Sequence, residues 1–368
     1  MQKVFEGWVK RYLADEEAVV LVILLATALI AFATIGSILV PLIAALIFAF
    51  LLQGIVTGLN RLGLSHLLSV LLTFTLFVGL LAYFFIGMLP LVVRQATNLL
   101  NQVPGIFSSL QKVFLELPEK YPQFISPATA EELTKWISEG SASFAEHSLS
   151  YLVSSLPGLL ALVVYLVLVP FLVFFMLKDK DELLSSLGTL FPKRRIVMLK
   201  IWDEMNVQLT NYVRGKAIEI LVVGATTYIV FLLLGVNYAA LLALLVGLSV
   251  IIPYVGAMLV TIPVVLVGFF QWGWSTEFFW LFVCYGVIQV LDGNVLVPVL
   301  FSEAVNLHPI LIILAVLFFG GIWGIWGVFF AIPLATLVKV LYNTWPRTQQ
   351  ESQPTELEQP AAEDVVTD

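Results

Sequence analysis

Long stretches of the chain consist almost entirely of apolar residues, and the charged residues lie between them. No charged residue occurs between Glu17 and Arg61, or between Glu219 and Glu277. Each stretch is long enough for two membrane crossings of roughly 20 residues. Neither shows the alternation of apolar and polar residues that is typical of strands in a membrane barrel. The pattern therefore predicts transmembrane helices.

The apolar runs and the segments between them divide the chain into successive parts. The predicted parts are a charged amphipathic lead on the cytoplasmic membrane surface (1–17), spans one to three (18–93), a helical extracytoplasmic insertion (94–150), span four (151–177), a basic cytoplasmic segment (178–216), a C-terminal transmembrane core (217–345) and an acidic tail (346–368). The fold class is all-α and polytopic, with about eight transmembrane helices and with broken or re-entrant segments in the C-terminal half.

Residues 94–150 have the composition of an ordinary soluble segment. Apolar residues recur every seven positions from Leu99 to Leu117, the pattern of a helix that packs on a partner helix. Ser126 precedes a second predicted helix. We expect a helical hairpin outside the membrane, which either caps the membrane domain or serves as a subunit-contact or substrate-gating module.

The distribution of basic residues predicts the orientation of the chain. The segment from Lys178 to Lys216 holds eight of the 18 Lys and Arg residues, so it is expected on the cytoplasmic side. Counting crossings from there, and taking Lys339 and Arg347 near the other end, places both termini in the cytoplasm. We predict a multi-pass protein of a bacterial-type plasma (inner) membrane. Residues 346–368 have a composition typical of disordered segments.

Composition narrows the possible functions. The chain is 60% hydrophobic and only 12% charged, against about 25% charged residues in soluble domains. Its formal net charge of -7 and its acidic tail do not favour a nucleic-acid partner. With three His, one Cys and no glycine-rich ATP-binding loop, the sequence predicts no enzyme, no metal site and no cofactor.

Prolines and glycines interrupt the apolar runs of the C-terminal half. Pro253 and Gly256 bracket Tyr254 between two runs that are each short for a full crossing, which indicates a hairpin of half helices or a kinked crossing. Pro298 marks a second interruption, and paired broken helices form binding sites in many secondary transporters. Close helix contact or a hinge is expected at a third, glycine-rich segment that contains Gly320, Gly321, Gly324 and Gly327.

Polar residues gather around the second interruption, between residues 287 and 309. Polar groups at membrane depth usually face a protein interior or a watery cavity, and they mark ion or substrate paths. Asp292 is our candidate for coupling to protons or sodium ions, with Gln289 and Asn294 as hydrogen-bonding neighbours. Alternatively, Asp292 caps a helix end. Further candidates are Glu303, Asn306 and His308, of which Glu303 and His308 could instead lie at the membrane surface.

Charged residues also occur at the predicted cytoplasmic end of span five. Arg214, Lys216 and Glu219 could form a cytoplasmic gate, with Arg214 and Glu219 as its principal members. The alternative is that these side chains extend to the membrane interface, as charges at a helix mouth commonly do.

The polar stretch and three other segments resemble the autoinducer-2 exporter family of permeases. The resemblance lies in Gln289, Asp292, Gly293, Asn294, Pro298, Leu307, His308 and Pro309, followed by GGIWGIWGVFFAIPLATLVKVL, and in FFMLKDKDEL (174–183), YVRGKAIEI (212–220) and IPYVGAMLVTIP (252–263). It covers most of the chain except the two termini and residues 94–150. It implies an eight-span transporter with both termini cytoplasmic, assembled as a homo-oligomer such as a pentamer. Members are associated with export of autoinducer-2, and some with sodium or proton exchange.

These observations lead to one main hypothesis and two alternatives. The main hypothesis is a secondary transporter in the lipid bilayer that exports a small hydrophilic solute or signalling molecule, driven by a proton or sodium gradient. The first alternative is a monovalent cation/proton antiporter. The second is a non-transporting membrane scaffold that binds partners through residues 94–150.

Overall fold

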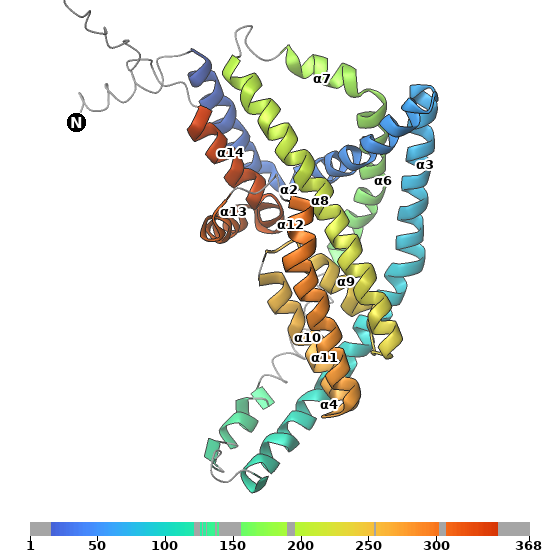
Figure 1. Cartoon of the computed structure of the whole chain (residues 1–368), viewed down its shortest axis with the longest axis vertical. Helices are drawn as coiled ribbons and strands as arrows, with labels where there is room; N and C mark the ends of the chain where they lie inside the picture. The colour runs from blue at the N-terminus through green and yellow to red at the C-terminus, as the bar shows by residue number, and fades with distance from the viewer. Residues whose placement is uncertain are drawn as a thin grey trace, which may run out of the picture.

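The computed structural model describes residues 16–120, 126, 128–129, 131–136, 138–139, 156–189, 196–253, 255–301 and 307–344 (Figure 1). Within these ranges every regular element is a helix, which confirms the all-α class. Most of the predicted surface lead and the whole of the predicted acidic tail lie outside the described residues.

The helices follow one another with few intervening residues. In chain order they are α2 (Glu16–Arg61), α3 (His66–Tyr83), the π-helical η1 (Phe84–Met88), α4 (Leu89–Lys120), α6 (Leu156–Lys178), α7 (Lys180–Gly188), α8 (Ile196–Leu234), α9 (Ala239–Ser249), α10 (Val255–Trp272), α11 (Thr276–Leu291), the π-helical η2 (Asp292–Leu296), α12 (Val297–Phe301), α13 (Pro309–Phe329) and α14 (Ala331–Thr344).

The described part of the chain contains six helices that are long and apolar enough to cross a membrane. A seventh crossing results if α6 and α7, which meet at a bend of 83°, are counted as one span. The predicted first span is a short apolar helix, Val19–Ala31. It is separated from the rest of α2 by a kink at Ile35. The polytopic helical architecture is therefore confirmed.

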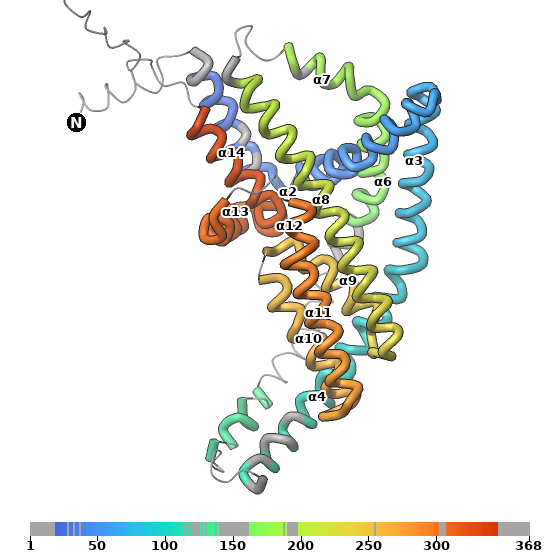
Figure 2. The backbone as a smooth tube through the Cα atoms, viewed as in Figure 1, coloured from blue at the N-terminus to red at the C-terminus, as the bar shows by residue number. Residues whose placement is uncertain are grey.

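The third predicted span does not end at residue 93. Helix α3 continues through η1 into α4, and Figure 2 shows this path running down one edge of the molecule to its far end. Beyond the membrane-length part, the Gln111 side-chain amide donates to the Ser138 hydroxyl at 2.7 Å. The Ser126 hydroxyl accepts a hydrogen bond from the Thr129 N–H at 3.2 Å, as an N-terminal cap does. A second helical piece therefore lies beside α4.

Helix α8 is the element around which the other helices are arranged. It packs against α2, α9, α11, α12 and α14 (Figure 1). The sequence predicted separate helices before and after residues 213–216, but α8 runs unbroken for 39 residues. Its backbone approaches α9 closely, because a Cβ added to Gly247 would lie 3.0 Å from the Cα of Gly224. Small residues permit such contact between membrane helices.

At the interruption near Pro253 the structure has two packed helices, of which only α9 is a half helix; α10, expected to be short, is long enough to cross a membrane. Helix α9 ends at Ser249 and α10 begins at Val255, and the two helices pack against each other. Residues from both arms share one core cluster, including Leu242 and Val246 from α9 and Val260 and Val264 from α10. With 11 residues, α9 is about 16 Å long and is too short to cross a bilayer alone.

Helix α13 folds back on itself at Gly324. This residue has φ 60° and ψ -137°, a conformation that glycine adopts without a side-chain clash. A Cβ added to Gly320 would lie 2.8 Å from the Val328 side chain, and one added to Gly327 would overlap the Phe319 carbonyl oxygen. Residues eight positions apart in a straight helix are separated by about 12 Å, so α13 makes a sharp reversal and not a single straight crossing.

Gly327→Ala is expected to destabilise this reversal. The added methyl would meet the backbone of Phe319, which cannot rotate away as a side chain can. Overpacking of this kind costs about 1–3 kcal/mol, so thermal unfolding of the purified protein in detergent should occur at a lower temperature. The matched control is Gly321→Ala, because no atom lies within 4 Å of its added Cβ. Equal melting temperatures for the two variants would contradict the fold-back.

Candidate functional site

A cavity of about 510 Å³ lies among α8, the segment between α9 and α10, the α11–α12 helix and the ends of α13 and α14. This volume lies within the range of small-molecule sites. Two elements supply its polar lining: α8 contributes Tyr212, Lys216 and Glu219, and the α11–η2 junction contributes Gln289 and Asp292. The cavity therefore brings together polar residues that are about 70 positions apart in the sequence.

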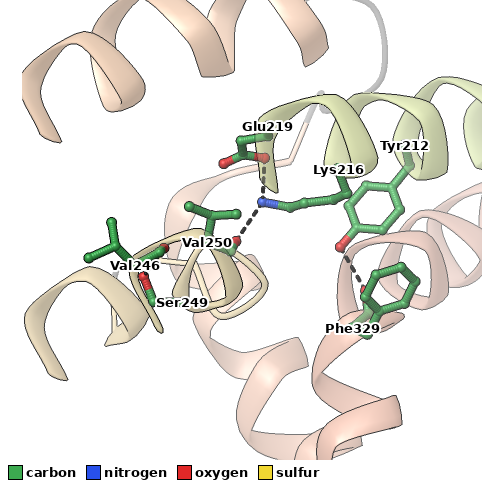
Figure 3. Close-up of polar contacts among 7 residues, drawn as sticks. All are labelled: Tyr212, Lys216, Glu219, Val246, Ser249, Val250 and Phe329. Carbon is green, nitrogen blue, oxygen red and sulfur yellow. Dashed lines mark hydrogen bonds and ion pairs between the residues drawn. The ribbon is translucent and has the colours of Figure 1, made fainter. Parts of the chain in front are cut away.

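Lys216 and Glu219 form an ion pair inside the protein. The Lys216 Nζ lies 2.7 Å from a Glu219 carboxylate oxygen, and the two residues are only 5% and 2% exposed. The same Nζ donates to the Val250 carbonyl at 2.7 Å (Figure 3). It also lies 5.3 Å from the centre of the Phe301 ring, within the range of a cation–π contact. Three neighbours thus stabilise the ammonium.

The sequence of α8 places these side chains on one face. Residues three and four positions apart are neighbours on a helix surface, so Tyr212, Lys216 and Glu219 point the same way. The Tyr212 hydroxyl donates to the Phe329 carbonyl at 2.7 Å and ties α8 to the end of α13 (Figure 3). This face of α8 therefore contacts the end of α13 through Tyr212 and the end of α9 through Lys216.

Asp292 lies at the start of the π-helical turn η2. The chain remains helical from Thr276 to Phe301, so the interruption predicted around Pro298 is not found within this range. A proline removes one backbone donor and crowds the preceding turn of a helix, and the wider η2 turn directly precedes Pro298. Single π-helical turns of this kind occur frequently at functional sites. Asp292 is therefore not a cap at the end of a span.

One carboxylate oxygen of Asp292 is buried and accepts no hydrogen bond from the described residues. The residue lines the same cavity as Lys216, whose charge acts on it as well as on Glu219. Buried polar atoms in native proteins nearly always have a partner, so an exception requires an explanation. The cavity beside Asp292 is the natural position for such a partner.

Several residues that the sequence singled out line this cavity, among them Gln289, Asp292, Pro253 and Pro298. Glu219 also lines it, although we expected this residue near a helix mouth. Gly256 packs closely against the backbone at the end of α9: a Cβ at Gly256 would overlap the Ser249 carbonyl oxygen.

Two other candidates lie elsewhere. Asn294 is exposed on the outer face of η2, and its side-chain amide donates to the Val290 carbonyl at 3.0 Å. His308 caps the start of α13, where its Nδ1 accepts from the Ile310 N–H at 3.3 Å. Asn294 is therefore not a neighbour of Asp292 in the cavity, since successive helical residues point about 100° apart.

Arg214 does not pair with Glu219. It is exposed, and its guanidinium lies 5.7 Å from the centre of the Phe50 ring on α2. Two residues apart on a helix, Arg214 and Lys216 point to nearly opposite sides. The ion-pair partner of Glu219 is Lys216.

The remaining candidates do not line the cavity or cannot be placed. Gly320, Gly321 and Gly324 belong to the α13 fold-back. Tyr254, Glu303 and Asn306 lie outside the described residues.

The sequence pattern did not indicate that Lys216 is buried beside a cavity, and it did not single out Tyr212 as a site residue. Because the predicted transmembrane core began at residue 217, Lys216 was expected at its cytoplasmic end, either in a gate or at the membrane interface. The spacing of 212, 216 and 219 is that of one helix face, and it would have indicated a single continuous helix with a polar side.

The arrangement predicts which cysteines react with a water-soluble thiol reagent. In a Cys284→Ser background, Gln289→Cys should react at least about tenfold faster than Val290→Cys, because the reactive thiolate forms in water and not in an apolar environment. Gln289 lines the cavity, whereas Val290 is 60% exposed on the outer surface of the same helix. Rates of modification in membrane vesicles provide the measurement, and equal rates would contradict a water-accessible cavity.

Comparison with known proteins identifies the family. The description "AI-2E family transporter" applies to the family that matches residues 19–347. The chain is 43% identical over 349 residues to "Putative permease PerM" of Escherichia coli (strain K12), covering 95% of this chain and 99% of that protein. It is 30% identical over 333 residues to "Putative transport protein YueF" of Bacillus subtilis (strain 168), covering 89% of each chain. The cavity thus lies within a multi-pass membrane protein that belongs to the AI-2E family of transporters.

Proposed function

We propose that this protein is a secondary transporter that exports a small hydrophilic solute or signalling molecule through the cavity beside Asp292, driven by a proton or sodium gradient. The observation that supports it is one cavity of about 510 Å³ that is lined by a buried ion pair and by Asp292. One oxygen of Asp292 has no hydrogen-bond partner among the described residues. Charged side chains within membrane helices are costly and mark ion or substrate pathways.

The irregular backbone around the cavity suits alternating access. Non-helical backbone at membrane depth is tolerated where it lines a cavity, and the α9–α10 turn contributes Ile252 and Pro253 to the lining. The fold-back of α13 at Gly324 is connected to α8 through the hydrogen bond from Tyr212 to Phe329. In the proposed cycle, the α9–α10 hairpin and the α13 fold-back move relative to α8 and open the cavity to one side at a time.

The proposal also includes the cellular setting. The basic segment 178–216 favours an inner membrane location with both termini in the cytoplasm. Assembly as a homo-oligomer, for example a pentamer, is part of the same proposal and follows from the family resemblance.

A second candidate function is a monovalent cation/proton antiporter. It is favoured by the excess of carboxylates over ammonium groups on the cavity. Everted membrane vesicles separate the two functions: sodium-driven proton movement in the absence of any organic solute supports the antiporter, whereas gradient-driven accumulation of autoinducer-2 supports the exporter.

Asp292→Asn is expected to abolish gradient-driven transport in these vesicles while leaving the protein inserted and folded. The amide has the shape of the carboxylate but cannot carry the charge that binds a coupling ion. Accumulation of autoinducer-2 under an imposed pH or sodium gradient provides the measurement, with protein abundance in the membrane as a check. The matched control is Asp203→Asn, an exposed carboxylate on α8 outside the cavity. Wild-type transport by Asp292→Asn would remove this residue from the mechanism.

A further inference from the structure

The charges that line the cavity do not balance. Its described lining holds two carboxylates, Glu219 and Asp292, and one ammonium, Lys216. The remaining titratable group there is Tyr212, which donates its hydroxyl proton to the Phe329 carbonyl and is neutral in that form. When the three charged groups are ionised, the cavity carries one excess negative charge.

The geometry decides which carboxylate carries this excess. Lys216 lies against Glu219 at 2.7 Å, and its contacts with the Val250 carbonyl and the Phe301 ring hold it there. Asp292 has no such direct partner for its buried oxygen among the described residues. An uncompensated charge in a poorly solvated site is costly, so the free energy of the cavity falls when a further cation joins Asp292.

We propose that Lys216 is a built-in counter-cation that limits the cavity to one exogenous monovalent cation, held at Asp292 and exchangeable between sodium and a proton. The inference deepens the proposed function, because it assigns the ion capacity of the same cavity. Lys216 neutralises the charge of one carboxylate, Glu219. The other carboxylate, Asp292, is left to bind an ion from solution. The Asp292 carboxylate and the Gln289 side-chain amide line the cavity together and offer the oxygen atoms that a sodium ion requires.

A purely structural ion pair would make a different prediction. If Lys216 and Glu219 only fasten α8 to the end of α9, removing either charge changes stability but leaves the number of bound cations unchanged. If Lys216 is a counter-cation, the number of bound cations follows the sum of the three charges. Charge counting therefore separates the two roles.

The experiment counts saturable binding of radioactive sodium to the purified full-length chain in detergent, at alkaline pH where protons compete least. The wild type should bind one sodium ion per chain. Glu219→Gln and Asp292→Asn should each bind none, because the remaining carboxylate pairs with Lys216. Lys216→Met should bind two, and the double variant Lys216→Met with Glu219→Gln should return to one.

Lys216→Met is the variant that a folding defect cannot imitate, because an unpaired buried charge lowers stability and can only reduce the sodium count, whereas the proposal expects the count to rise to two. Arg214→Gln is the matched control on the outer side of α8, and its count should remain one. Release of protons on sodium addition at lower pH identifies the proton as the exchanging ion. A wild type that binds no sodium, a Glu219→Gln variant that still binds it, or a double variant that binds none would each overturn the proposal.

Failure of this inference differs from failure of the proposed function. Sodium counts that follow the charges, without any movement of autoinducer-2 in vesicles, would support the ion site and reject the exporter. Gradient-driven export with counts that ignore the charges would support the exporter and reject the role of Lys216.

Discussion

An ammonium and a carboxylate lie 2.7 Å apart in the middle of α8, almost completely shielded from solvent. Desolvation of two charges is costly unless further polar contacts accompany the pair. Here α9 supplies one of them: it ends at Ser249, and the Val250 carbonyl just beyond it accepts from Lys216. Carbonyl groups at the end of a helix lack partners within the helix. The carbonyl group just beyond α9 therefore gains a donor from the Lys216 ammonium, and the ammonium gains an acceptor.

This requirement constrains the elements around α8. The break between α9 and α10 must lie close to Lys216, and the Phe301 ring covers the ammonium from another side. Gly215 makes room for that ring, because a Cβ there would lie 2.7 Å from it. The reversal of α13 brings the Phe329 carbonyl to Tyr212, one turn before Lys216. Irregular backbone from two separate parts of the chain thus meets one polar helix face.

The same constraint connects the fold with the proposed transport. A cavity with paired charges alone would have little electrostatic preference for an additional ion, whereas a second carboxylate gives it one. Asp292 supplies that carboxylate from the π-helical turn of the neighbouring helix, and it lines the cavity. In the proposed mechanism, the gradient supplies the ion that neutralises the charge of Asp292, and the binding and release of that ion drive export.

Much of the architecture is encoded locally. The membrane-spanning class follows from apolar runs longer than a bilayer requires, and the breaks near Pro253 and Gly324 follow from the backbone properties of proline and glycine. Asp292 and Gln289 stood out as candidates because polar residues within apolar runs are rare. These features depend only on residue type and on near neighbours in the sequence.

Only the tertiary structure decided which polar residues share the cavity. The sequence could not exclude a helix boundary before residue 217, and that boundary made Arg214 and Glu219 appear to be the pair; the continuous α8 turns Lys216 inward and Arg214 outward. Asn294 likewise lies close to Asp292 in sequence but on the outer side of the same turn. The side of a helix that faces the protein is set by packing against distant segments, so no local pattern of residues could assign these partners.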